Sequence, residues 1–395
     1  MSAVSPTIPE IPAERYATRL AGARREAAAA GLDALLIGVG ADLRYLTGYD
    51  AVALERLTML VVPVAEGAQL TLIAPRLEAT PARACTAAAS GAVAVVAWEE
   101  TEDPMSLVAT TLEVALHRPA HHLGAVAVSD GLRASFLLGL QRVLPGARFS
   151  LASAVLRTLR MRKDAAEVEL LRLAAHAADR VIASIAAGTL VGRTEADVAR
   201  EVIERLIAEG HEHAEFSIVA SGPNSASPHH HPGERVIEAG EPIVLDIGGT
   251  IGGYASDTTR MVWVTGGDPA RGPDEEYLRL YGVLQDAQSE ATGAVRPGVP
   301  CERVDAVARG IIEAGGYGPR FIHRTGHGIG LEVHEDPYLV AGDQEPLAPG
   351  IAFSVEPGIY LEGRYGARIE DIVVCGDSGP IVLNESTHDL LVVDG

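Results

Sequence analysis

Two pairs of acidic residues, each arranged about a glycine-containing turn, most constrain the fold of this chain. Asp246 and Asp257 lie eleven positions apart, on the strand-like runs PIVLDIGG and GYASDTTRMVWV around the turn GGTIGG. Such a pattern predicts a β-hairpin. A turn centred between Ile251 and Gly252 would place the two aspartates directly opposite each other. Because like charges at opposed positions destabilise a sheet, we expect a cation between them.

A second acidic pair repeats this arrangement. Glu356 and Glu370 lie in FSVEPGIY and GARIEDIVVC, with Gly363 midway between them. Pro357 removes a backbone donor, so a bend in that strand is expected. His327 lies in GHGIG, where glycines permit close approach of the backbone. The five candidate ligands on the inner face of the predicted sheet are therefore Asp246, Asp257, His327, Glu356 and Glu370.

Four carboxylates and one imidazole form an oxygen-rich ligand set. Hard or borderline divalent ions such as Mn²⁺, Co²⁺ or Zn²⁺ suit such a set, and the ligands suffice for two ions that share carboxylates. A two-ion centre makes hydroxide from water at neutral pH and stabilises both oxygens of a hydrolytic transition state. Any one of these residues alone would be better explained as a surface acid or a loop histidine. Their combined spacing predicts a metallohydrolase.

Composition excludes several classes of partner. Asp and Glu number 53 against 32 Lys and Arg, which gives a formal net charge of −21. Nucleic acids and anionic membranes require basic patches, so neither is expected as a partner. No uninterrupted apolar span and no signal peptide are recognised. Cys85, Cys301 and Cys375 are far apart and form no CxxC pair, which favours a reducing compartment. We expect a cytoplasmic protein.

The first 160 residues alternate between two kinds of segment. Helices are predicted near residues 13–30, 105–116 and 131–143. Strands are predicted at DALLIGVG, TMLVVPV, LTLIAP, GAVAVVAW and AVAVSD. This alternation indicates an α/β layer with a largely parallel or mixed sheet. The run GVGAD is too short for a dinucleotide fingerprint and has no acid at the required distance.

The remainder of the chain combines long helices with the two hairpins. An amphipathic helix is predicted over Ala166–Ala187, and Thr194 begins TEADVAR with the residues of an N-cap. Further helices are predicted near residues 275–295 and 302–315, the second after Pro300. We expect helices that cover a curved antiparallel sheet, with the acidic residues on its inner face.

The motifs VLDIGG, YASDTTR, RTGHGIG, SVEPGIY and ARIEDIVV resemble those of the pita-bread metallopeptidases. That family includes methionine aminopeptidase, prolidase (Xaa-Pro dipeptidase) and aminopeptidase P. The resemblance covers roughly residues 160–395, and DLRYLTGYD resembles the N-terminal domain of creatinase- and prolidase-type proteins. It implies an α/β N-terminal domain over residues 1–158, followed by an α+β pita-bread catalytic domain over residues 159–395.

The resemblance also implies a role for each ligand. It predicts two divalent metal ions per subunit, with Mn²⁺ favoured and Co²⁺ or Zn²⁺ as alternatives. Asp246 would chelate one ion, while Asp257 and Glu370 would bridge both. His327 and Glu356 would complete the shell of the second ion. Glu356 would also serve as the proton shuttle of the reaction.

Additional residues match the proline-peptidase branch of the family. His229, in SGPNSASPHHHPGER, would lie over the site and contact the substrate backbone. His323 and His334 would line the pocket and steady the tetrahedral intermediate. Arg368 matches an arginine near the bridging glutamate, with a simple salt bridge to the acids as the alternative. Tyr360 is interpreted as a packing residue.

Only one of His229, His230 and His231 is expected to contact the substrate, and the SGPN…PH pattern favours the first over the other two. We interpret His230 and His231 as solvated loop residues, with adventitious metal binding by the run of three as the alternative. Replacing either by alanine is therefore predicted to be nearly neutral. His388 has no motif around it and is interpreted as structural.

The implied function is hydrolysis of Xaa-Pro bonds by a metal-bridging hydroxide. The expected substrates are small peptides with proline at the second position, cleaved by a dipeptidase or an aminopeptidase that forms a homodimer. The long N-terminal region favours these over methionine aminopeptidase. The alternatives are a hydrolase of the same fold without proline specificity, a creatinase-like enzyme that works without metal, and a non-catalytic binding protein. The intact ligand set argues against the last two.

Overall fold

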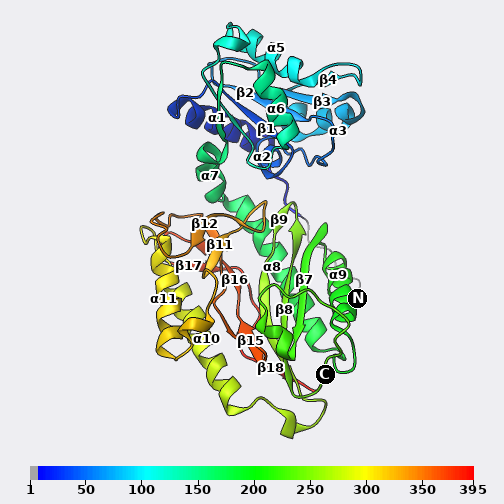
Figure 1. Cartoon of the computed structure of the whole chain (residues 1–395), viewed down its shortest axis with the longest axis vertical. Helices are drawn as coiled ribbons and strands as arrows, with labels where there is room; N and C mark the ends of the chain where they lie inside the picture. Colours follow the sequence, from blue (N-terminus) through cyan, green and yellow to red (C-terminus); the bar gives the residue numbers. More distant parts are fainter. Residues whose placement is uncertain (1–7) are drawn as a thin grey trace. The chain divides into compact units, whose positions relative to one another are not determined.

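The computed structural model describes residues 8–395, which divide into two compact units. One unit is Ile11–Arg160, and the other is Met161–Gly395 together with residues 8–10 (Figure 1). The division predicted between residues 158 and 159 falls inside helix α7 (Ser153–Met161). None of the helices in the described part combines the length and apolar character that crossing a membrane would require.

The N-terminal unit is an α/β layer. Its six strands run in the order β4-β3-β2-β1-β5-β6, and β1 is antiparallel to β2 but parallel to β5, so the predicted mixed sheet is confirmed. The strands are β1 (Ala34–Gly38), β2 (Met59–Pro63), β3 (Thr71–Pro75), β4 (Ala94–Trp98), β5 (Ala125–Val128) and β6 (Arg148–Leu151). The helices are α1 (Ala13–Ala29), α2 (Ala41–Thr47), α3 (Ala79–Ala84), α4 (Thr86–Ala89), α5 (Pro104–Leu116), α6 (Ala134–Val143) and α7, with short 3₁₀ turns η1 (Arg76–Glu78) and η2 (Ala120–His122).

The C-terminal unit contains two five-stranded sheets and a separate hairpin. The first sheet has the order β18-β10-β8-β7 with β9 paired to β8, the second has the order β12-β11-β13-β16-β17, and β14 pairs with β15. The first sheet consists of β7 (His213–Ser221), β8 (Glu241–Ile251), β9 (Tyr254–Ala255), β10 (Thr258–Val264) and β18 (Leu391–Val393). The other strands are β11 (Gly326–Gly328), β12 (Glu335–Leu339), β13 (Ala352–Val355), β14 (Gly358–Leu361), β15 (Tyr365–Arg368), β16 (Asp371–Cys375) and β17 (Pro380–Val382).

Four long helices flank these sheets (Figure 1). They are α8 (Ala165–Ala186), α9 (Glu195–Ala208), α10 (Glu275–Gly293) and α11 (Cys301–Ala314), and the short turns are η3 (Gly222–Ala226), η4 (Pro269–Arg271) and η5 (Gly318–Arg320). The N-cap predicted at Thr194 is confirmed, because its side chain accepts from the backbone of Asp197. Helices α8 and α9 share a core with β7, β8 and β10, while α10 and α11 share another with β13 and β16.

Alternation along β8 sorts its residues between two faces. Ile243, Leu245 and Ile247 belong to the core under α8 and α9, whereas Val244 belongs to the core on the opposite side. Because successive strand residues point to opposite faces, Asp246 lies on the side of Val244. The sheet therefore presents Asp246 inward, away from α8 and α9, as the sequence predicted for the ligand face.

The first acidic hairpin forms, but its register differs from the prediction. Its turn is Gly252–Gly253, both with positive φ as a two-residue hairpin turn requires. Asp246 is consequently opposite Thr259, not Asp257, so the predicted direct opposition of the two aspartates is wrong. The turn lies one residue further along than predicted, which shifts the pairing by two positions. A shift of two preserves the face, and both aspartates remain on the same side.

The second acidic hairpin has the predicted register. Val355 pairs with Asp371, and Gly358 pairs with Arg368, so the pairing is symmetric about Gly363. Glu356 and Glu370 fall between these pairs, where the strands leave one sheet and enter the separate hairpin. Pro357 lies in this interruption, in agreement with the bend that was expected.

Candidate metal centre

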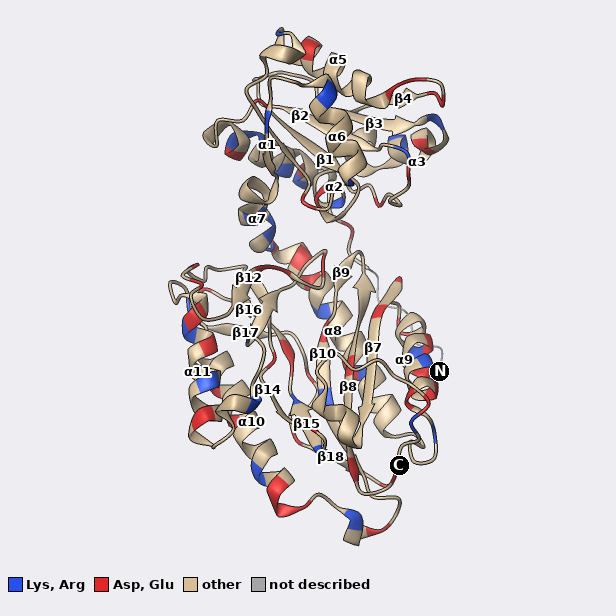
Figure 2. Cartoon of the chain, in the orientation of Figure 1, with Lys and Arg blue, Asp and Glu red and all other residues tan. Residues whose placement is uncertain are grey.

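The acidic residues meet at a seam between the two sheets. Thr259 of β10 forms an isolated antiparallel bridge with Glu370, whose backbone N–H donates to the Thr259 carbonyl over 3.2 Å. The Thr259 hydroxyl also donates to Glu370 Oε2 over 2.7 Å. This bridge brings the two hairpins together, and Figure 2 shows acidic residues on strands inside this unit as well as on its outer helices.

Ligand atoms converge in three overlapping groups. In each group they lie within 4.8 Å of one another, close enough to share a cation. The groups are Asp246, Asp257 and Glu370; His327, Glu356 and Glu370; and Asp257, His327 and His334. The structure therefore brings together all five predicted ligands, and it adds His334 to their immediate surroundings. Asp257, His327 and Glu370 each belong to two groups, so the three groups form one connected cluster.

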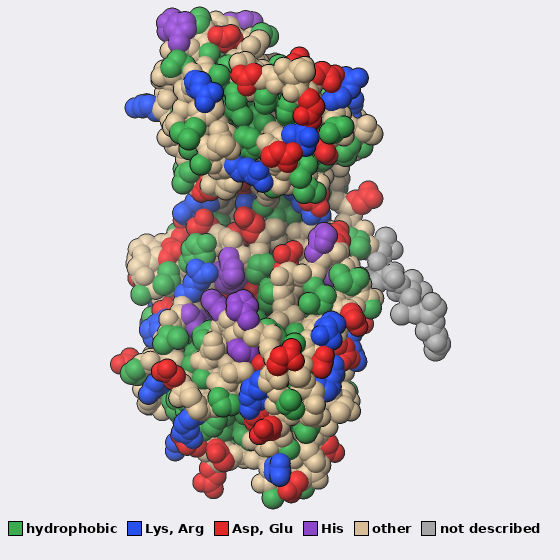
Figure 3. All heavy atoms as spheres, turned by 45° about the vertical axis from the view of Figure 1, so that its right-hand side comes forward, with side chains coloured by type: hydrophobic (Ala, Val, Ile, Leu, Met, Phe, Trp, Pro, Cys, Tyr) green, Lys and Arg blue, Asp and Glu red, His purple; other side chains and the backbone are tan. Residues whose placement is uncertain are grey.

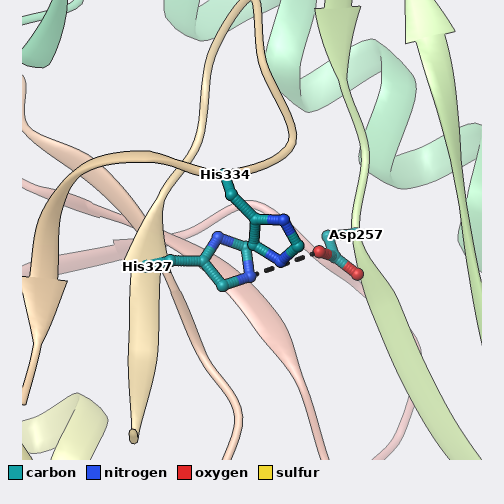
Figure 4. Close-up of side chains that lie close together, drawn as sticks. All are labelled: Asp257, His327 and His334. Carbon is teal, nitrogen blue, oxygen red and sulfur yellow. Dashed lines mark ion pairs between the residues drawn. The ribbon is translucent and has the colours of Figure 1, made fainter. Parts of the chain in front are cut away.

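His327 is oriented by its own strand. Its Nδ1 lies 3.2 Å from the Gly328 carbonyl oxygen, which can only accept, so Nδ1 carries the proton. Nε2 then faces the acids, 3.2 Å from Glu356 Oε1 and 3.5 Å from Asp257 Oδ2, and Figure 4 shows the second of these contacts. Without an ion, Nε2 donates to Glu356; when a cation binds, Nε2 would give up that proton and offer its lone pair instead. The glycine frame predicted for His327 thus fixes which nitrogen faces the site.

Two buried carboxylate oxygens in the site have no hydrogen-bond partner among residues 8–395. Asp246 receives a hydrogen bond from Arg368 on Oδ2, and Glu370 receives one from Thr259 on Oε2. The remaining oxygens, Asp246 Oδ1 and Glu370 Oε1, have none. An unpaired buried polar atom is costly, and a carboxylate oxygen is the ligand that hard divalent cations prefer. These residues therefore fit divalent metal ions.

Burial without cations disturbs the ionisation of the same acids. Burial raises the pKa of Asp257 well above its usual range, and the charge of Asp246 adds to the rise. Burial likewise raises the pKa of Glu370, with a further contribution from Asp257. The pKa of Asp246 is also raised by burial, although Arg368 opposes the rise. Metal ions would restore the ionised forms, because a bound cation is the largest local charge in such a site.

Glu356 differs from the other acids. Burial alone would raise its pKa, but the hydrogen bond with His327 and the charge of that ring lower the pKa to about 2. Its Oε1 also accepts from the Ser354 hydroxyl over 3.1 Å. Glu356 is therefore ionised at neutral pH.

Arg368 is fully engaged inside the protein. Its side chain is 4% exposed and forms an ion pair with Asp246. The guanidinium also donates to the Thr259 hydroxyl over 3.1 Å and to the Tyr360 hydroxyl over 2.8 Å. Arg368 thus orients one metal-facing carboxylate and one tyrosine, which agrees with the salt-bridge alternative considered from the sequence.

His323 and Tyr360 form a hydrogen-bonded pair. His323 Nε2 lies 2.9 Å from the Tyr360 hydroxyl, and its Nδ1 lies 2.7 Å from the Arg324 carbonyl oxygen. Both ring nitrogens are therefore engaged, although the ring lines the cavity. The interpretation of Tyr360 as a packing residue was incomplete, because its hydroxyl connects His323 to Arg368. No local sequence signal marks this contact.

The ring of His334 packs against the ring of His327. The two rings are 4.1 Å apart in an edge-to-face arrangement, and Figure 4 shows His334 beside Asp257. Burial lowers the pKa of His334 to about 4, and the charge of His327 adds to the decrease, so the ring is neutral at neutral pH. The next residue, Glu335, forms a buried ion pair of 2.7 Å with Lys163, the only lysine of the chain. This pair fixes the end of the loop that carries His334.

A cavity of about 820 Å³ opens onto these residues. Histidine side chains gather on this face of the C-terminal unit (Figure 3). The residues that line the cavity include Phe216 and Ile218 of β7 together with His229, His323, His334 and Arg324. Its volume lies in the range of small-molecule sites, so a short peptide would fit beside the acids.

Comparisons with known proteins identify the family. The sequence model described as metallopeptidase family M24 matches residues 169–377, and that of the creatinase/prolidase N-terminal domain matches residues 19–162. The chain belongs to metallopeptidase family M24. It is therefore a two-domain metallopeptidase, and the predicted pita-bread family and fold class are confirmed.

Relatives of this M24 metallopeptidase match over nearly the whole chain. The probable dipeptidase PepE of Mycobacterium tuberculosis is 46% identical, over 96% of this chain and 97% of the relative. The crystal structure of dipeptidase PepE from Mycobacterium ulcerans has a TM-score of 0.88 and 44% identity, over 97% of this chain and 99% of that chain. A prolidase structure from Thermococcus sibiricus has a TM-score of 0.87 and 35% identity, over 97% and 100%.

Proposed function

We propose that this metallopeptidase is a two-metal enzyme that hydrolyses Xaa-Pro dipeptides. The observation that carries the proposal is the pair of buried, unpartnered carboxylate oxygens on Asp246 and Glu370 beside a peptide-sized cavity. Asp246, Asp257, His327, Glu356 and Glu370 would hold the ions. When bound, the ions would activate water and polarise the scissile carbonyl.

The surrounding side chains would orient the substrate and move the proton. Glu356, ionised and hydrogen-bonded to Ser354, would take a proton from water and deliver it to the proline nitrogen, which leaves poorly until protonated. His334, neutral at neutral pH, would donate a hydrogen bond toward the carbonyl oxygen. His229 would contact the substrate backbone from the cavity wall. Arg368 would keep Asp246 in place while Asp246 binds an ion.

The nature of the ions and of the cell compartment is part of the proposal. We favour Mn²⁺, with Co²⁺ or Zn²⁺ as alternatives, because carboxylates outnumber imidazoles in the ligand set. A cytoplasmic location is supported by three cysteines that are all buried and free. A homodimer is proposed only because the family resemblance implies one.

Arg324 supports a dipeptide as the substrate. Its guanidinium lies 4.3 Å from the Tyr338 ring centroid, and the residue is one of those that line the cavity. Among residues 8–395 it has no ion pair with an acid, whereas Arg368 is fully engaged. A dipeptide carries a free carboxylate on its second residue, one residue beyond the scissile bond. We propose that Arg324 binds this carboxylate.

The experiment measures turnover of a panel of peptides by protein treated with a chelator. The same protein is then assayed after addition of Mn²⁺, Co²⁺ or Zn²⁺. We expect no turnover after chelation, recovery with metal, and Ala-Pro as a better substrate than Ala-Ala or Met-Ala-Ser. Full turnover by metal-free protein would contradict the two-metal mechanism. Equal rates on Ala-Pro and Ala-Ala would favour a second candidate, a dipeptidase without proline preference. That candidate has independent support, because the PepE relatives are described only as dipeptidases.

Substrate length is tested with Ala-Pro, Ala-Pro amide and Ala-Pro-Ala. Loss of one charge-assisted hydrogen bond should lower kcat/KM about 10- to 10²-fold for the amide relative to the free acid. Arg324→Gln should remove this preference while metal content stays unchanged. If Ala-Pro-Ala is cleaved as fast as Ala-Pro, the enzyme is an aminopeptidase, and the role proposed for Arg324 is wrong.

A further inference from the structure

The segment that carries His229 is attached to a buried carboxylate through the histidine that follows. We propose that His230 is a positioning residue, which fixes His229 in the cavity by means of its hydrogen bond to Glu195. The inference rests on the proposed function, in which His229 contacts the substrate. It also replaces the interpretation of His230 as a solvated loop residue.

Glu195 is the fixed end of this arrangement. It is the first residue of α9 and is 0% exposed. Its Oε1 accepts from the Ser221 backbone over 2.7 Å, from the Ser221 hydroxyl over 2.8 Å and from the Asn224 amide over 3.0 Å. Its Oε2 lies 2.7 Å from His230 Nε2. Burial would raise its pKa, but these hydrogen bonds lower it, so the carboxylate is ionised and Nε2 must be the donor.

The residue before His229 is attached as well. The Pro228 carbonyl accepts from the Arg368 guanidinium over 3.4 Å, and Arg368 in turn holds Asp246. The backbone N–H of His230 donates to the Ser227 carbonyl over 3.2 Å, which closes a turn around His229. Pro228 is thus held by Arg368, and His230 is held by Glu195 at the start of α9.

His229 itself is left available. It is exposed and lines the cavity, and its ring makes no hydrogen bond to another residue of the described chain. By contrast, the His230 side chain is only 18% exposed. His231 is exposed and has no hydrogen-bond partner among the described residues. All three histidines line the cavity, and only the middle ring connects the loop to a buried charge.

Removing the hydrogen bond between His230 and Glu195 should lower turnover without releasing bound metal. A misplacement of a catalytic contact by about 1 Å can cost about 10²-fold in rate. With Mn²⁺-loaded protein and Ala-Pro as substrate, we expect His230→Ala to lower kcat about 10- to 10²-fold while bound metal is unchanged. His231→Ala, in the same loop, is the matched control and should retain the wild-type rate. A wild-type rate for His230→Ala would overturn the proposal.

A double-mutant cycle separates positioning from an independent role. If His230 acts through His229, the variant with both residues replaced by alanine should be no slower than His229→Ala alone. Additive losses would show that His230 acts by another route. His230→Gln places an amide nitrogen at the same number of bonds from the backbone as Nε2. It should recover most of the lost rate, and failure to do so would contradict the anchoring role.

Amide hydrogen exchange tests the anchor without measuring activity. Exchange in residues 227–232 should be faster in metal-loaded His230→Ala than in wild type and unchanged in His231→Ala. Unchanged exchange in His230→Ala would overturn the inference even if turnover falls. If wild-type protein cleaves none of the peptides, the proposed function fails. The exchange comparison would then still decide whether His230 holds the loop.

Discussion

Glu370 and Asp371 are neighbours in sequence, yet they face opposite surroundings. Glu370 Oε1 has no hydrogen-bond partner in the described part of the chain, and burial raises the pKa of Glu370 well above its usual range. Asp371, also buried, receives hydrogen bonds from Arg260 over 2.7 Å and from Gln288 over 3.0 Å, and it lies 2.6 Å from His388. Burial alone would raise the pKa of Asp371, but His388 and Arg260 lower it.

This contrast distinguishes two uses of a buried acid. Alternation along the chain directs Glu370 toward the seam and Asp371 toward α10. On the α10 side the protein supplies every partner that the carboxylate needs. On the seam side it supplies one donor, from Thr259, and leaves the other oxygen without one. A buried acid whose donors are incomplete therefore indicates a cation site, whereas burial alone does not.

The largest effect is expected on the seam side. Glu370→Gln should lower turnover by at least about 10²–10³-fold, the usual cost of removing one stabilising group from a transition state. Bound metal per chain should fall at the same time, because the proposed bridge is lost. Metal analysis and steady-state rates provide the measurement, and Asp371→Asn is the neighbouring control. Two tightly bound ions in Glu370→Gln would refute the assignment of Glu370 as a bridge.

On the other side of the strand, the expected loss is one of stability. Asp371→Ala leaves the Arg260 guanidinium, 1% exposed, without its ionic partner. Breaking a buried pair in this way typically costs about 3–5 kcal/mol. Urea unfolding of the metal-loaded variant should show this decrease while metal content remains that of wild type. A variant that lost metal but kept its stability would reverse the roles assigned to the two acids.

A smaller effect is expected when the Thr259 hydroxyl, which donates to Glu370, is removed. Thr259→Val removes the hydroxyl that connects Glu370 to Arg368. Replacing such an outer partner typically lowers metal affinity about 10- to 100-fold. Thr258, whose hydroxyl accepts from Asn384, lies next in the strand and points the other way, so Thr258→Val is the matched control. Equal metal affinity in the two variants would contradict the distinction between the faces.

The smallest effect is a difference in pH dependence. In metal-free protein, Glu370 has a raised pKa in the folded state, so it lowers stability increasingly as pH rises above its unfolded value of about 4.3. The stability gained by Glu370→Gln should therefore be greater at pH 7 than at pH 4. Asp371 has a lowered pKa, so the loss in Asp371→Asn should instead shrink as pH falls through that folded pKa. Melting temperatures measured with chelator between pH 4 and pH 7 would test the Glu370 trend, and measurements continued below pH 4 would test the Asp371 trend.

The sequence predicted the ligands better than their pairing. The acids stand in motifs whose spacing is local, and the register about Gly363 follows from one turn glycine. In the other hairpin, glycines lie on both sides of Thr250 and Ile251, so the sequence allows more than one turn centre. The structure selects Gly252–Gly253, and period-two alternation keeps both aspartates on the same face.

The contacts that sequence reasoning missed are long-range and have no periodic pattern. His230 and Glu195 are 35 positions apart, and His323 and Tyr360 are 37 apart. Neither pair lies within one motif, so only the folded backbone reveals the contact. Strand β7, which was not predicted, supplies Phe216 and Ile218 to the cavity wall. The proposed metal ligands were thus more readily predicted than the residues that support them.

The bridge between Thr259 and Glu370 also affects the order in which the protein can assemble. These residues are 111 positions apart in sequence. Ribosomes add about 5–20 residues per second, so the aspartates of the first hairpin wait several seconds before Glu370 is even synthesised. During that interval the nascent chain has no complete ligand set. The complete set of proposed ligands can therefore bind metal ions only after Glu370 has been synthesised, and not during the earlier steps of synthesis.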